Sequence, residues 1–141
     1  MDNLSPPIDE QLKQAYLSSL YRVSDPAFDI RIGITHEPLD QWLATRGYSC
    51  WAFVTAWNPK SSLLSIEENE ARHQALMVEV ASLGYSWQEG WGIGQDGSWA
   101  PEKSILVPGI MLKEAISIAR QFGQLAIVFG EAGNAAQLIW V

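Results

Sequence analysis

The sequence predicts a single α+β domain over residues 1–141, in which a mixed, largely antiparallel central sheet packs with about four helices. A chain of 141 residues has the size of one domain. In some segments apolar residues recur every three or four positions, as on amphipathic helices, and in others they alternate with polar residues, as on half-buried strands. Strand segments follow one another as hairpins and also alternate with helices, which gives the predicted order α β α β α β β α β β.

The first half of the chain alternates between helices and strands. Every fourth residue is apolar over 8–20, which predicts a helix after a loose lead-in over 1–7. Apolar and polar residues alternate over 28–34, as in a strand with one buried face. A short helix is predicted over 38–47, with proline in its first turn and glycine at its end. Residues 49–57 then form the clearest strand.

The second half begins with the longest predicted helix. Ser65 and Glu68 form a capping box at its start, and Gly84 ends it. The remaining predicted elements are hairpin strands over 85–93 and 103–107, a helix over 111–122, and two strands over 125–129 and 137–141. Because residues 49–57 and 125–129 are apolar on both faces, we expect both strands in the interior of the sheet.

Composition argues against several classes of partner. The net charge is −7, and the nine Lys and Arg residues are scattered, so no nucleic-acid partner is expected. A small anionic ligand is still compatible with this composition, because one or two nearby cations are enough to bind it. No apolar run approaches the roughly 20 residues of a membrane span, and residues 1–7 lack the pattern of a signal peptide. We therefore expect a cytoplasmic protein without membrane contact.

Motifs for metals, cofactors and reactive cysteines are missing, so none of these is expected. His36 and His73 lie 37 residues apart, which is not ligand spacing. The glycines of 90–94 lead into a turn and not into a helix, which does not fit a dinucleotide-binding loop. Cys50 is the only cysteine, and its apolar neighbours predict a core residue.

Polar residues around the start of the longest helix are the first candidates for a site. Asn58 lies in a loop between the predicted central strand and this helix start, where anions often bind; ordinary turn chemistry explains the same loop. Asn69 and His73 fall within the apolar stripe of the helix, and Arg72 falls on its flank. Buried polar groups need partners, so these side chains either line a cleft or form a structural cluster. For His73 the structural role is favoured.

Four residues elsewhere complete the candidates. Arg31 opposes the apolar face of its strand and points to solvent unless another element covers it. Glu102 is the candidate general base, or a ligand to a hydroxyl group; the alternative is an exposed carboxylate beside Lys103. Trp57 and Trp99 flank the polar candidates and offer flat binding surfaces, unless they belong to an aromatic core.

Several motifs taken together resemble a known family. They are Thr55-Ala56-Trp57-Asn58-Pro59, Glu68-Asn69 with Arg72, Trp99 with Glu102 and Ser104, and Phe122-Gly123-Gln124 before Ala126-Ile127. In this combination the chain resembles, from about Tyr16 to its C-terminus, the bacterial family of domains of unknown function numbered 3293. The resemblance implies no activity. It implies that the polar family features are Arg31, Asn58, Asn69, Arg72, Glu102 and Gln124.

The sequence leaves three functions open. The first is a site for a small anionic or nucleotide-like ligand. Its residues would be Arg31, Asn58, Asn69, Arg72 and Glu102, with Trp57 and Trp99 as stacking surfaces. The second is a non-enzymatic protein-interaction module with a Trp-rich surface, and in the third the polar groups only tie loops to helices. No nucleophile–base pair is evident, so catalytic residues and enzymatic activity stay undecided.

Overall fold

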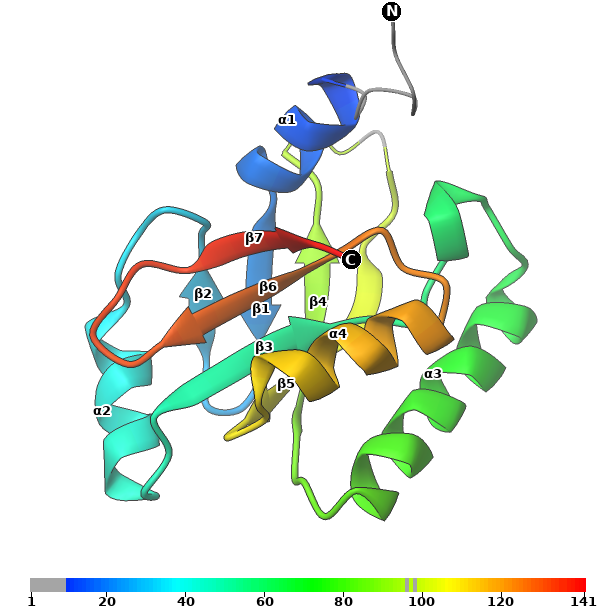
Figure 1. Cartoon of the computed structure of the whole chain (residues 1–141). Coiled ribbons are helices and arrows are strands. Elements are labelled where there is room, and N and C mark those ends of the chain that lie inside the picture. The colour runs from blue at the N-terminus through cyan, green and yellow to red at the C-terminus, as the bar shows by residue number, and fades with distance from the viewer. Residues whose placement is uncertain (1–9, 96, 98) are drawn as a thin grey trace, which may run out of the picture.

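In the part of the chain that the structure describes, seven strands form one sheet in the order β2-β1-β4-β5-β3-β6-β7 (Figure 1). Their bounds are β1 Leu20–Val23, β2 Phe28–Ile30, β3 Cys50–Val54, β4 Gln88–Ile93, β5 Glu102–Pro108, β6 Ala126–Glu131 and β7 Gln137–Trp140. Each of the six neighbouring pairs is antiparallel. The computed structural model describes residues 10–95, 97 and 99–141, so the predicted lead-in over 1–7 lies outside the described residues.

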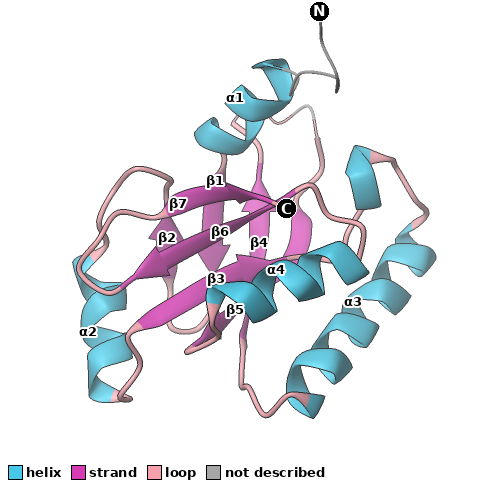
Figure 2. Cartoon of the chain, in the orientation of Figure 1, coloured by secondary structure: helices cyan, strands magenta, loops and turns pink. Residues whose placement is uncertain are grey.

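Over these described residues, four helices surround the sheet, with a short 3-10 turn, η1, before the third. Their bounds are α1 Glu10–Ser18, α2 Glu37–Thr45, η1 Pro59–Ser61, α3 Ile66–Ser82 and α4 Leu112–Gln121. Figure 2 shows α3 and α4 along one side of the sheet and α1 and α2 at separate ends of it. The predicted α+β class is confirmed, and the predicted elements follow one another in the predicted order, with one strand added. Within the described ranges, no helix has the length and apolar character needed to cross a membrane.

Strand β1 is an addition to the predicted elements. The helix predicted over 8–20 ends at Ser18, where the Ser19 hydroxyl donates to the carbonyl of Ala15. The chain then pairs with both β2 and β4. A spacing of four residues is also a multiple of two, so the apolar Leu20 fits a helix and a strand equally well. Pairing with distant strands decides between them, and periodicity does not report that pairing.

The sheet is curled so that its two edge strands approach each other. Ile32, just after β2, forms an isolated parallel bridge with Ala136, just before β7. The amide of Gly33 donates to the carbonyl of Ala136 over 2.8 Å. Both edges of the sheet are therefore brought together at this contact.

Curling creates an inner and an outer face, and each has its own apolar core. The inner core contains Trp51 and Phe53 of β3 and is closed at one end by Leu39 and Leu43 of α2. The outer core packs under α3 and α4, and Cys50 lies at its margin. Its sheet residues are Ala52, Val54, Ile105, Val107, Ile127 and Phe129. β3 and β6 each have strands on both sides and apolar groups on both faces, which confirms their predicted interior positions.

Candidate functional site

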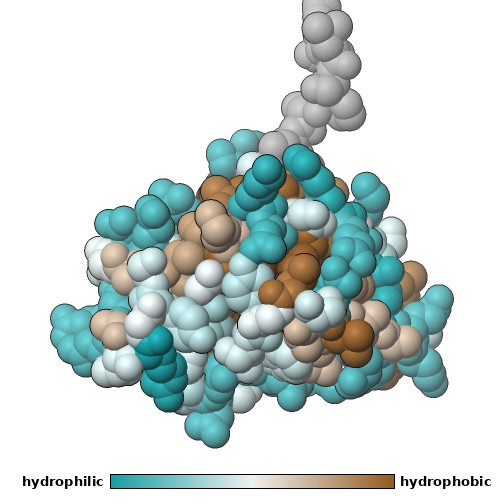
Figure 3. Space-filling model, turned by 60° about the horizontal axis from the view of Figure 1, so that its bottom comes forward, coloured by the Kyte–Doolittle hydropathy of each residue, from teal (hydrophilic) through white to brown (hydrophobic). Residues whose placement is uncertain are grey.

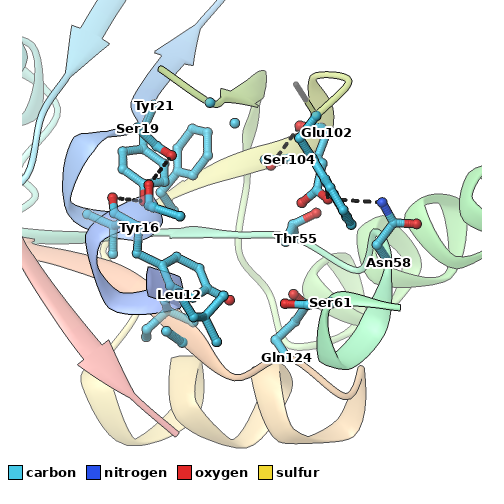
Figure 4. Close-up of a pocket in the computed structure, with 18 of the residues that line it drawn as sticks. Leu12, Tyr16, Ser19, Tyr21, Thr55, Asn58, Ser61, Glu102, Ser104 and Gln124 are labelled. Atoms are coloured by element: carbon cyan, nitrogen blue, oxygen red, sulfur yellow. Dashed lines mark hydrogen bonds between the residues drawn. The ribbon is translucent and has the colours of Figure 1, made fainter. Parts of the chain in front are cut away.

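A cavity of about 400 Å³ lies at the end of the curled sheet that α2 does not close. Tyr16 of helix α1 and Ser19, directly after this helix, belong to one wall (Figure 4). The loop after β3 and the start of β5 supply the opposite wall, including Asn58 and Glu102. The floor is the edge of the inner core at Phe53. Segments from both halves of the chain therefore enclose the space.

Glycines on β4 and directly after it help to leave this space open. Gly92 and Gly94 both line the cavity. A Cβ atom added at Gly92 would meet no heavy atom closer than 3.9 Å, so a side chain there would project into the cavity. Gly90 has a different role, because a Cβ atom there would lie 2.2 Å from the Arg22 carbonyl oxygen and 3.2 Å from the Phe53 ring. The glycines of 90–94 thus serve strand packing and cavity shape.

Glu102 is the central polar group of the cavity wall. Its Oε2 accepts hydrogen bonds from Asn58 Nδ2 at 3.0 Å and from Trp99 Nε1 at 2.5 Å. The side chain of Lys103, the next residue, points away from Glu102, since its Nζ lies 2.5 Å from a carboxylate oxygen of Glu70 on α3. Burial raises the pKa of Glu102, and the bonds from Trp99 and Asn58 oppose that rise without cancelling it.

Asn58 is held by a dense set of hydrogen bonds. Its side-chain Oδ1 accepts hydrogen bonds from Asn69 Nδ2 at 2.8 Å and from the backbone amide of Leu64 at 3.0 Å. Its backbone amide donates to Asn69 Oδ1 at 2.8 Å. Its backbone is left-handed, with φ of 45°, a conformation that asparagine tolerates better than most residues. These contacts leave Nδ2 aimed at Glu102. Asn69 therefore orients Asn58, and Asn58 orients the carboxyl group.

Aromatic rings cover much of the remaining wall. Tyr16 packs edge-to-face on Trp140 of β7 with centroids 5.5 Å apart, which fixes α1 against the sheet. The Tyr21 hydroxyl donates to the Tyr16 carbonyl at 2.6 Å. Burial raises the pKa of both tyrosines, so their hydroxyls are neutral at physiological pH. The Trp99 ring, 38% exposed, borders the opening.

The family model described as "Protein of unknown function (DUF3293)" matches residues 54–127, just over half of the chain. The chain belongs to the DUF3293 family. No curated protein and no solved structure is significantly similar to it. The matched segment runs from β3 into β6 and includes the wall formed by Asn58 and Glu102, whereas Arg31 and α1 lie outside it.

Some predicted site residues of this DUF3293 protein converge and others do not. Asn58, Trp99 and Glu102 line the cavity together with Gln124. Asn69 lies behind Asn58 and supports it. No group of three or more His, Cys, Asp or Glu side chains in the described part of the chain is placed to hold a metal ion.

Besides Asn69, three predicted residues lie outside the cavity lining. Arg31 is exposed, and its Nη1 is 3.4 Å from the Ser18 carbonyl oxygen. Trp57 packs edge-to-face on His73 at 6.4 Å, and the buried His73 imidazole lies 3.4 Å from a Glu89 oxygen. The third is Arg72. Roles for Arg31, Trp57 and Arg72 in ligand binding stay predictions.

Arg72 connects the loop after β3 to the end of α4. Its Nε donates to the Ala56 carbonyl at 2.8 Å, and an Nη donates to the carbonyl of Phe122, the C-cap residue of α4. A cation at a helix C-terminus also interacts favourably with the helix dipole. These contacts favour a structural role for Arg72.

We expect Arg72→Ala to lower the unfolding free energy by about 2–4 kcal/mol, because two carbonyls lose a charged donor. Differential scanning calorimetry should show a lower melting temperature. Arg31→Ala, which removes an exposed arginine, is the matched control and should change stability by less than about 0.5 kcal/mol. Equal stability of the two variants would contradict the structural role.

Glu102→Gln should stabilise the DUF3293 fold at neutral pH. Glutamine keeps an acceptor for Asn58 and Trp99 and removes a buried charge. The raised pKa means that folded Glu102 holds its proton more tightly than unfolded Glu102, so wild-type stability falls as pH rises from about 4.5 through the folded pKa. The variant should melt a few degrees higher than wild type at pH 7.5 and lose this advantage at pH 4. A variant that melts lower at pH 7.5 would contradict the expectation.

Tyr16 and Gly92 line the cavity but are not among the predicted site residues. Tyr16 looks like any apolar residue on a helix stripe, and nothing local reveals that α1 covers the end of the sheet. The glycines carried a usable signal, because glycine at alternate positions of a strand indicates missing side chains on one face. Glu102 and Asn58, which are both predicted site residues, line the cavity, and their hydrogen bond joins residues 44 positions apart.

Proposed function

We propose that this protein binds a small organic molecule in the cavity between α1 and the Asn58–Glu102 wall. The observation that carries the proposal is a largely buried carboxyl group, oriented by two fixed donors and facing a space of about 400 Å³. Ligand sites have volumes of about 300–1,000 Å³ and combine apolar walls with a few placed polar groups. Burying Glu102 disfavours its charged form, and such groups are concentrated at functional sites.

The composition of the cavity bears on the charge of the ligand. No lysine, arginine or histidine is present among the described residues that line it. An anionic or nucleotide-like ligand would meet Glu102 without a compensating cation there. We therefore favour a neutral or positively charged ligand for this cavity.

Binding is favoured over catalysis by the partners of the nearby hydroxyl groups. The Thr55 hydroxyl donates to the Lys103 carbonyl at 2.6 Å, and the Ser104 hydroxyl donates to the Glu102 carbonyl at 3.1 Å. Neither is bonded to a side chain that could act as its base, so no activated nucleophile is formed by these two groups.

The protein-interaction alternative has less support. Among the seven tryptophans, Trp91 and Trp99 are the exposed ones, at 36% and 38%, and the Trp99 indole nitrogen is bonded to Glu102. On the face shown in Figure 3, apolar residues form separate patches among hydrophilic ones. No broad Trp-rich surface is apparent in the part of the chain that the structure describes.

Filling the cavity tests the proposal. A thermal-shift screen of neutral, cationic and anionic fragments on the wild-type protein should give compounds that raise its melting temperature, because a ligand of the native state stabilises it. Gly92→Phe places a ring in the cavity and should abolish these shifts. Gly92→Ala, which adds one methyl group at the same position, should keep most of them.

Circular dichroism and unfolding curves must first show that both variants fold. Shifts that persist unchanged in folded Gly92→Phe would place the ligand elsewhere and refute the proposal. A screen in which no fragment of any charge stabilises the wild-type protein would refute it as well.

A further inference from the structure

Glu102 is the one charged side chain among the described residues that line the cavity. The nearest basic residue in sequence, Lys103, projects from the opposite face of β5 to Glu70 and Trp91, because side chains alternate along a strand. Arg22, on β1, is paired with Asp29 on the outside of the sheet. The charge of an ionised Glu102 is therefore uncompensated within the cavity lining, which is costly unless a partner supplies the opposite charge.

The hydrogen bonds of Glu102 are asymmetric. Both fixed donors, Asn58 Nδ2 and Trp99 Nε1, reach Oε2. Among the described residues, neither of these donors reaches Oε1, and we assign this oxygen to the ligand. Donors that are themselves charged form the strongest bonds to such an oxygen.

A second acceptor can come from Gln124, which also lines the cavity. Its amide nitrogen donates to the Trp57 carbonyl at 3.1 Å and is 3.4 Å from the Phe122 carbonyl. These bonds use the donor end of the amide, so its oxygen is the end that can serve a ligand. An ammonium group has three donors and no acceptor, which matches a site rich in acceptors.

Aromatic rings face this polar wall across the cavity. In Figure 4, Tyr16 and Tyr21 lie on the side opposite Glu102 and Asn58. Phe53 forms part of the floor, and Trp99 borders the opening. Ring faces attract cations and also pack against the apolar part of a ligand.

From these features we propose that the cavity is selective for a small organic cation, a protonated amine with an apolar body, whose ammonium group binds Glu102. The inference rests on the proposed function and adds the chemical class of the ligand. The apolar body lies toward Tyr16, Tyr21 and Phe53, and the ammonium group donates to Oε1 of Glu102. Ligand charge thus supplies the compensation that the described lining residues do not provide.

Three probes of similar shape and different charge test the inference: 2-phenylethylamine, 2-phenylethanol and 3-phenylpropionate. Their dissociation constants for the whole protein are measured at pH 7.5 by calorimetry, with ligand-observed NMR for weak binding. We expect the amine to bind about tenfold or more tightly than the alcohol, and the acid to bind least. Glu102→Gln should weaken amine binding about 10- to 100-fold and change alcohol binding by less than about threefold.

Glu67→Gln is the matched control, because it removes one negative charge from an exposed position at the start of α3. It should leave the preference for the amine unchanged, since exposed charges at a distance are screened by salt. If the alcohol binds as tightly as the amine, the inference is refuted. If Gly92→Phe also abolishes the binding of both, the proposed function still stands. If none of the probes binds at millimolar concentration, the inference fails, and the fragment screen decides the proposed function separately.

Discussion

Asn58→Ala is expected to destabilise the protein by about 4 kcal/mol or more, a large part of the 5–15 kcal/mol that holds a domain of this size together. The Leu64 amide and Asn69 Nδ2 would lose their acceptor, and Glu102 would lose a donor. A buried polar group without a partner costs about 1–3 kcal/mol. Alanine would also occupy a left-handed conformation, φ 45°, at a further cost of about 1 kcal/mol. The decrease in the free energy of unfolding, measured with urea, gives the sum of these costs.

Two further substitutions separate these causes. Asn58→Gly removes the same side-chain bonds but accepts the positive φ, so it should be about 1 kcal/mol more stable than Asn58→Ala. Asn58→Asp keeps an acceptor for Leu64 and Asn69 and places a second carboxylate beside Glu102, which should raise the pKa of Glu102 further. If Asn58→Ala lowers the free energy of unfolding by less than about 1 kcal/mol, the hydrogen bonds of Asn58 do not hold the loop after β3 in place.

Gly90→Ala is expected to have a comparably large effect, above about 4 kcal/mol or loss of soluble protein. The added Cβ would lie 2.2 Å from the Arg22 carbonyl oxygen, a backbone atom of the paired strand β1, and 3.2 Å from the Phe53 ring. A flexible side chain could move aside, but a backbone atom held in a strand pair cannot do so without separating β1 from β4.

The matched control lies two residues along the same strand. Gly92→Ala meets no atom closer than 3.9 Å, so it should change the unfolding free energy by no more than about 1 kcal/mol. Unfolding curves of the two variants should therefore differ by several kcal/mol. Equal curves would show that β1 and β4 tolerate a wider separation than their pairing implies.

Most helices and strands could be predicted from the sequence, because helix caps and apolar patterns are set by residues close together in the chain. The reciprocal capping box between Ser65 and Glu68 forms at the start of α3 as expected. β3 and β6 are recognisable because residues buried on both faces are apolar throughout. β1 was missed because a helix and a strand fit the same apolar spacing near Leu20, and only pairing with β2 and β4 distinguishes them.

Some of the residues around the cavity could also be predicted, because their signal lies within one helix or strand. Asn69 was recognised as a polar residue within an apolar stripe, and it is buried with Asn58 as its partner. Arg72 was placed near the same helix start, but its direction depends on where α4 ends, 50 residues further along. The expectation of an anion rests on Arg31, Arg72 and the helix start, whereas the charged side chain among the described lining residues is the carboxyl group of Glu102.

The contact between Ile32 and Ala136 has a consequence for the order in which the molecule is made. Pairings between segments so distant along a chain form slowly, because a long loop must close first. The cavity draws its walls from α1 and from β6, so a growing chain cannot form the cavity until β6 has left the ribosome. Hairpins such as β4–β5 can form earlier. We therefore expect a ligand to protect the finished protein from proteolysis without assisting its nascent chain.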